Sequence, residues 1–249
     1  MKICIVGGGH IGTAMACYFK RRIPDAVIVL QVRDATRFAP RLKCNDIEGG
    51  FSYYSEPDLI TSDYSRSITG ADVVYIALPH FLIEDVFKAI SPYVNEGAYV
   101  GVVPGSGGSE FYFEKIFGDR AKLLGFQRVP FTSRLVKYGE EVNLNSWKPL
   151  SVIGTLFSSD LDQAIQLVEA CGLKTAKAAN FMAISMAPSN PVLHTSRIYE
   201  LFGSSDDRKQ VFKGRRKFYV GWTDAASRIM LEMDAELHKM IGAVGGALG

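Results

Sequence analysis

The feature that most constrains the fold is residues 2–34, which fit a strand, a glycine turn, a helix and a second strand into one βαβ unit. Residues 3–6 are a short apolar run that stops at a glycine, as expected for a parallel strand buried on both faces. Residues 11–19 carry apolar side chains at helical spacing, so a helix is expected to begin just after the glycines. The stretch therefore predicts the start of an α/β fold built on a parallel sheet.

Between the expected strand and helix, Gly7, Gly9 and Gly12 have the spacing G-x-G-x-x-G. In this motif the first glycine allows a tight turn, the second lets the backbone approach a pyrophosphate, and the third lets helix and strand pack closely. The unpaired amides at the helix N-terminus add a preference for an anion. We predict a dinucleotide site here that includes the neighbouring residues His10 and Ile11.

The end of the second strand decides which dinucleotide is preferred, and it holds Arg33 and Asp34. A carboxylate alone accepts hydrogen bonds from a free ribose 2′-hydroxyl and favours NAD, whereas an arginine offers a forked cation to the 2′-phosphate of NADP. Further basic residues follow in the same loop: Arg37, Arg41 and Lys43. We predict NADP, with NAD as the alternative cofactor and a solvated basic loop as the alternative explanation of the arginines.

Composition limits the remaining function classes. The chain has 249 residues, 47% of them hydrophobic, and a formal net charge of +2, so it can form a sizeable core and has no strong field for nucleic acid or an acidic membrane. Its four cysteines form no CxxC pair, which argues against a metal site and a disulfide framework and favours a cytoplasmic location. No apolar run approaches the ~20 residues of a membrane helix. We expect small-molecule partners.

Two later apolar runs, residues 71–78 and 98–103, predict further buried strands. Ligands bind at the carboxyl ends of strands in such sheets. The residues expected to line the cofactor site at these ends are Leu78, Pro79, Pro104 and Gly105. His80 also lies there, but nothing near it in sequence would orient its ring, so we interpret it as a loop histidine.

The remaining chain divides into an α/β part and a helical part. Further elements of the first part are strands at 121–126 and 150–153 and a helix at 159–171, whereas 38–57 is interpreted as a loop with a short strand at 51–54. An ordered loop at 130–134 carries Arg134. We predict a Rossmann-type doubly wound parallel sheet over residues 1–179. The expected helical domain spans 180–249, with helices at 181–187, 192–202 and 222–241.

The helical part contains a basic cluster that we interpret as a solvated surface, because no aromatic platform accompanies it. Its members are Arg208, Lys209, Lys213, Arg215, Arg216 and Lys217.

Several motifs, in order along the chain, resemble the octopine/nopaline (opine) dehydrogenase family. They are Pro104-Gly105 followed by Gly107-Gly108 and Glu110-Phe111, then Pro130 with Arg134, then Asn190-Pro191-Val192-Leu193-His194, Phe218-Tyr219, and Asp234-Ala235-Glu236. The NPVLH run is the most specific of them. The resemblance covers essentially the whole chain.

The resemblance implies an NAD(P)-dependent oxidoreductase that reduces the imine formed from an amino acid and a 2-keto acid. It gives His194 the catalytic role, and Asn190 and Arg134 are the expected substrate contacts. In the family an aspartate completes the pair with this histidine, and the resemblance places it beyond residue 249, in the part of the helical domain that this chain lacks. A homodimer formed through the helical domain is the oligomer we consider.

The chemistry of hydride transfer fits a histidine. An imine or keto carbon that accepts hydride develops charge on its nitrogen or oxygen, and an acid that titrates near neutral pH can then donate a proton. Two alternatives stay open. One is a non-catalytic dinucleotide-binding sensor or interaction protein. The other is a ketopantoate or glycerol-3-phosphate type of reductase, which would need a catalytic lysine that the sequence does not place.

Overall fold

A computed structural model describes residues 1–105, 107–203, 214 and 217–248 of the protein, and the side chains only as far as residue 244. Its contacts divide the chain into two compact units, Met1–Ser185 and Met186–Gly249. The sequence placed the boundary between residues 179 and 180. Within the basic cluster only Lys217 is described; its other members, from Arg208 to Arg216, lie outside the described residues.

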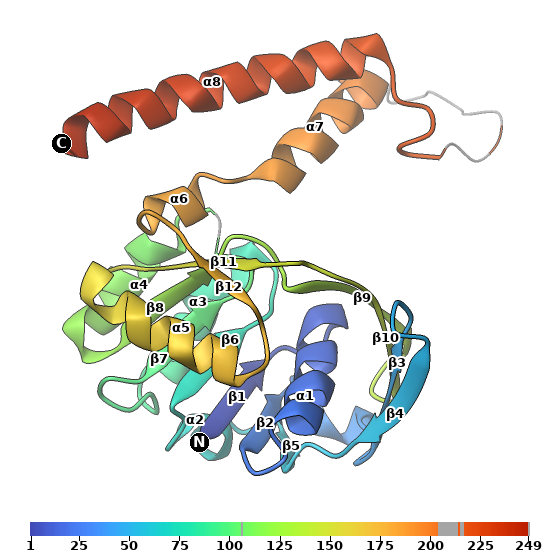
Figure 1. Ribbon diagram of the computed structural model, residues 1–249, viewed down its shortest axis with the longest axis vertical. Helices are drawn as coiled ribbons and strands as arrows, with labels where there is room; N and C mark the ends of the chain where they lie inside the picture. Colours follow the sequence, from blue (N-terminus) through green and yellow to red (C-terminus); the bar gives the residue numbers. More distant parts are fainter. Residues whose placement is uncertain (106, 204–213, 215–216, 249) are drawn as a thin grey trace. The chain divides into compact units, whose positions relative to one another are not determined.

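The first unit is built on a large, mostly parallel sheet (Figure 1). Its described strands are β1 (Lys2–Val6), β2 (Val27–Gln31), β5 (Leu59–Thr61), β6 (Val73–Ile76), β7 (Tyr99–Val102), β8 (Lys122–Phe126), β11 (Ser151–Thr155) and β12 (Thr175–Lys177), in the spatial order β12-β11-β8-β7-β6-β1-β2-β5. Neighbouring strands are parallel except β11 and β8, which are antiparallel. The predicted Rossmann-type α/β class is confirmed.

Side chains of the central strands alternate between two buried layers, one on each face of the sheet. In β1, Ile3 and Ile5 pack with Phe19, whereas Cys4 and Val6 pack on the opposite face. The helices of the first layer are α1 (His10–Arg22) and α5 (Leu161–Ala170), and those of the second are α2 (Tyr64–Ile68), α3 (Ile83–Ile90), α4 (Ser109–Phe117) and α6 (Met182–Ser185). Burial on both faces explains why these strands are continuous apolar runs in the sequence.

A second sheet covers α1 on its outer side (Figure 1). Its strands are β3 (Leu42–Asp46), β4 (Phe51–Ser55), β9 (Phe131–Lys137) and β10 (Glu141–Trp147), in the order β4-β3-β10-β9. The prediction of loops at 38–57 and 130–134 is therefore wrong, except for the short strand at 51–54. In β3 the buried apolar residues are only Leu42 and Cys44, and β3 pairs with β10 far along the chain, so local sequence signals gave little indication of it.

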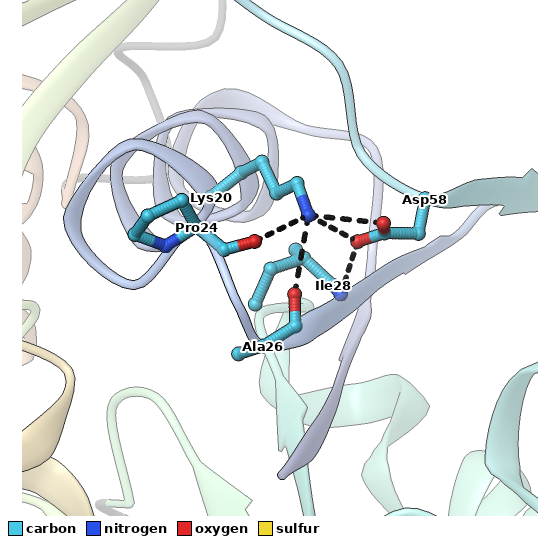
Figure 2. Close-up of polar contacts among 5 residues, drawn as sticks. All are labelled: Lys20, Pro24, Ala26, Ile28 and Asp58. Atoms are coloured by element: carbon cyan, nitrogen blue, oxygen red, sulfur yellow. Dashed lines mark hydrogen bonds and ion pairs between the residues drawn. The ribbon is translucent and has the colours of Figure 1, made fainter.

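A polar network fixes the end of α1 to the beginning of β2 (Figure 2). The Lys20 ammonium donates to the carbonyl oxygens of Pro24 (2.9 Å) and Ala26 (3.2 Å) and to the Asp58 carboxylate (2.9 Å). The Asp58 carboxylate also accepts the backbone N–H of Ile28 at 2.8 Å. The α1–β2 connection and the residue before β5 are therefore joined around one ion pair.

The second unit is helical in its described part, as predicted. Its helices are α7 (Ser189–Phe202) and α8 (Asp224–Leu248), which pack against each other. Across all described residues, no helix combines the length and apolar content needed to cross a membrane.

Candidate functional site

The three motif glycines of the loop between β1 and α1 differ in how much space surrounds them. Gly7 has φ +124°, and a Cβ there would lie 2.6 Å from the carbonyl oxygen of Ala77. A Cβ at Gly12 would collide with the carbonyl oxygen of Gly7. At Gly9, in contrast, a Cβ would meet nothing within 4 Å. Gly7 and Gly12 are thus required by the fold, whereas Gly9 faces open space that a pyrophosphate can enter.

A pocket of about 520 Å³ opens beside this loop at the carboxyl ends of β1, β2, β5 and β6. It is lined by Gly7, Gly8, Gly9, Gln31, Val32, Arg33, Asp34, Arg37, Ser62, Tyr64, Leu78, Leu82, Asp85, Val86 and Tyr138. β1 lies between β2 and β6, so the strand order reverses at the pocket. Open α/β sheets bind ligands at such a switch point, and the backbone amides of the α1 N-terminus supply donors for an anion.

Four of the predicted cofactor contacts line this pocket: Gly7, Gly9, Arg33 and Leu78. The other six do not line it: His10, Ile11, Gly12, Pro79, Pro104 and Gly105. Gly105 instead packs against the neighbouring strand β8. A Cβ at Gly105 would be 3.0 Å from the Gly125 Cα, and the Gly105 N–H donates to the Phe126 carbonyl at 2.7 Å.

The charged end of the pocket holds Arg33, Asp34 and Arg37, all exposed. The Asp34 carboxylate accepts hydrogen bonds from the Thr36 hydroxyl (2.6 Å) and the Thr36 backbone N–H (3.0 Å). These bonds, with the positive charge of Arg37, hold the pKa of Asp34 below its usual value. Asp34 is therefore an anion at neutral pH. In the sequence it lies between two arginines, Arg33 and Arg37.

Tyr138 is a pocket residue that the sequence did not predict. It lies in the turn between β9 and β10, far along the chain from the glycine loop, and reaches the pocket because the second sheet packs over α1. The glycine after it, Gly139, has φ +75° and marks a turn. That turn was the one available signal in the sequence, and it did not indicate which part of the protein the turn would contact.

Two histidines near the glycine loop lie outside the pocket lining. The His10 Nδ1 accepts the backbone N–H of Leu135 at 2.9 Å, which leaves the ring proton on Nε2 when the ring is neutral. His80 is exposed and lies against Gly107, where a Cβ would be 3.2 Å from the His80 ring. Across the described chain, no three metal-ligating side chains gather into a possible metal site.

The predicted catalytic histidine lies on α7 in the second unit. The His194 Nε2 is 2.9 Å from the Tyr219 hydroxyl, and its ring meets Phe218 edge-on at a centroid distance of 5.4 Å. Asn190 is exposed one turn earlier on the same helix. One turn after His194, the buried Arg197 forms an ion pair with Glu200 at 2.5 Å.

Arg134, the predicted substrate contact, belongs to the first unit. It lies exposed on β9, and its guanidinium donates to the Ser133 carbonyl at 3.2 Å. Its site role stays a prediction, as do those of Asn190 and His194.

The fold and the glycine-lined pocket define a Rossmann-type, nucleotide-binding α/β domain followed by a helical unit. A family model described as the N-terminus of NAD-dependent glycerol-3-phosphate dehydrogenase matches residues 2–105. This match covers the glycine loop, β2 and the strands to β7.

Opine dehydrogenases resemble the chain over nearly its whole length. Octopine dehydrogenase of Mizuhopecten yessoensis is 27% identical over 97% of this chain and 64% of its own, and tauropine dehydrogenase of Arabella iricolor is 23% identical over 94% and 63%. A solved octopine dehydrogenase structure with NADH and L-arginine has a TM-score of 0.84 at 23% identity, covering 99% of this chain and 65% of that one. The expected resemblance to this family is confirmed, and the chain spans a little under two thirds of these relatives.

Proposed function

We propose that the protein is an NAD(P)-dependent oxidoreductase of the opine dehydrogenase type, which reduces the imine formed from an amino acid and a 2-keto acid. The observation that carries this proposal is the pocket at the switch point of the sheet, in a chain similar to octopine dehydrogenase over 97% of its length. The open space at Gly9 fits a pyrophosphate, and the same pocket reaches Arg33 and Asp34, where the adenosine ribose of a dinucleotide is expected.

The preferred cofactor in this proposal is NADP. Arg33 and Arg37 put two guanidinium groups at the ribose end of the pocket, against the single carboxylate of Asp34. A guanidinium matches the geometry of a phosphate with two parallel hydrogen bonds. NAD is the alternative, since Asp34 is ionised and can accept hydrogen bonds from a free 2′-hydroxyl.

The chain's own residues have distinct roles in the proposed reaction. The bound cofactor supplies the hydride. His194 provides the proton for the reduced nitrogen, and Phe218 and Tyr219 orient its ring. Asn190 and Arg134 bind polar groups of the substrates. We also propose a dimer formed through the helical unit, and the four buried, unpaired thiols support a cytoplasmic location.

The test is oxidation of NADPH in the presence of pyruvate and a panel of amino acids. The proposal expects oxidation only when keto acid and amino acid are both present. Oxidation with the keto acid alone would indicate an ordinary keto-acid reductase, and oxidation with glycerone phosphate alone would indicate a glycerol-3-phosphate type of enzyme.

One observation favours a second candidate, dinucleotide binding without turnover. In the described part of the chain the His194 ring contacts a tyrosine hydroxyl and forms no ion pair with a carboxylate. Saturable NADPH binding combined with no oxidation for any substrate pair would support this candidate.

A further inference from the structure

The adenosine end of the pocket is formed in part by the second sheet, and its role in cofactor choice rests on the proposed dinucleotide function. The turn between β9 and β10 packs on the segment that follows β2. The Ala39 backbone N–H donates to the Gly139 carbonyl at 2.8 Å, and a Cβ at Gly139 would collide with the carbonyl oxygen of Arg37. The two backbones are therefore in direct contact, at a position where only glycine fits.

This contact places an aromatic ring beneath a cation. The Arg37 guanidinium lies 4.5 Å from the centroid of the Tyr138 ring, and Phe38 meets the same ring edge-on at 5.1 Å. Stacking leaves the edge of a guanidinium, with its N–H donors, available for a phosphate. Both Arg37 and Tyr138 line the cofactor pocket, so the stacked guanidinium faces the space that the ligand occupies.

The other arginine of the pocket has a different environment. Arg33 lines the pocket together with Tyr64, the first residue of α2. No aromatic ring stacks on Arg33 among the described residues. Arg37 is thus the guanidinium that the protein holds in place, and ordering it in advance lowers the entropy cost of a phosphate contact.

We propose that Arg37, stacked on Tyr138, contacts the 2′-phosphate of NADP together with Arg33, and that Tyr138 is the positioning residue of Arg37. In this arrangement the second sheet contributes to cofactor choice although it belongs to no βαβ unit. NADH lacks the phosphate and gains little from the pair.

The test measures binding of NADPH, NADH and 2′,5′-ADP by calorimetry, with thermal unfolding as the check that each variant is folded. Arg37→Ala and Tyr138→Leu should each weaken NADPH and 2′,5′-ADP about tenfold, as expected for loss of a charge-assisted contact, and leave NADH nearly unchanged. Tyr138→Phe keeps the ring and should bind all three ligands as the parent does.

The double variant Arg37→Ala/Tyr138→Leu separates positioning from a general effect. If Tyr138 acts through Arg37, the double variant should bind NADPH no more weakly than Arg37→Ala alone. Additive losses, equal losses for NADPH and NADH, or a Tyr138→Phe variant as weak as Tyr138→Leu would overturn the proposal. If the unaltered protein binds NADH and Arg37→Ala leaves NADPH binding unchanged, this inference alone is wrong. If the unaltered protein binds neither dinucleotide, the proposed function is wrong as well.

Discussion

Helices α1 and α8 illustrate how differently the two units are stabilised. α1 has 13 residues, of which seven are buried between the two sheets. α8 has 25 residues, yet among its described side chains only Ala226 is buried, and Leu231 and Met240 are 63% and 57% exposed. The helix that follows the glycine loop is therefore held by a packed core between two sheets, whereas the His194 site depends on few contacts within α7 and its neighbours.

We expect cofactor binding by the first unit to be independent of changes in the second. Among the described residues, the pocket proposed for the cofactor is lined only by residues of the first unit. Changes in the second unit should alter turnover and leave cofactor affinity intact, and changes in the glycine loop should remove cofactor binding.

The largest expected effect is that of Gly9→Val. Because a Cβ at Gly9 meets nothing within 4 Å, the variant should fold, but its side chain would fill the space needed for the pyrophosphate, and measurable NADPH binding should be lost. Fluorescence of bound NADPH measures this. The matched control is Gly12→Ala, whose Cβ collides with Gly7 and should lower the free energy of unfolding by about 1–3 kcal/mol or more. Retained binding in a folded Gly9→Val variant would mean that the loop is merely a tight turn.

The second prediction concerns His194→Ala. It should lower the rate of reduction by about 10²–10⁴-fold, the usual contribution of a general acid, and leave NADPH affinity unchanged. Steady-state kinetics and NADPH titration test the two halves separately. Tyr219→Phe, which removes the hydroxyl 2.9 Å from the His194 Nε2, should lower the rate by a smaller factor. A parental rate for His194→Ala would make it an ordinary packed histidine.

A smaller effect is expected for Arg33→Ala. Loss of a charge-assisted contact should weaken NADP by about 10- to 100-fold and NAD much less. Lys88→Ala, which removes a surface cation that is paired with Glu84 and does not line the pocket, controls for net charge. Comparable losses for both cofactors would show that Arg33 does not read the 2′-phosphate.

The smallest effect is that of Asp58→Asn in the network around Lys20. Burial alone would raise the pKa of Asp58, but the bonds from Lys20 and the Ile28 N–H outweigh it and lower the pKa. The stabilisation is therefore present above the unfolded-state pKa and is lost as the pH falls through the lower folded-state value. The Asp58 side chain is 38% exposed, so screening limits the expected loss to ~1 kcal/mol at neutral pH.

Chemical denaturation at neutral and acidic pH measures the difference, which should shrink in acid. Asp162→Asn is the control. Asp162 is 79% exposed and its partner Lys177 is 61% exposed, so loss of this ion pair should change stability little. A difference between parent and Asp58→Asn that grows in acid would contradict the assigned direction.

The sequence predicted the elements whose signals are local, and it missed those that depend on residues far apart in the chain. The glycine motif and the apolar run before it determine β1, the loop and α1 within twenty residues, and their predicted structure is present. The second sheet was not predictable in this way, because Asn45 of β3 and Asn143 of β10 are 98 positions apart and bond side chain to side chain. Tyr138 was missed for the same reason, since its neighbour Arg37 is distant in sequence.

The most direct test of the account is a calorimetric titration of NADPH and NADH into the unaltered 249-residue protein, with Gly9→Val as the blank. We expect saturable binding of one equivalent of either cofactor, tighter for NADPH, and no binding heat from the Gly9→Val protein. Absence of binding for both cofactors in the folded parent would contradict the assignment of the pocket.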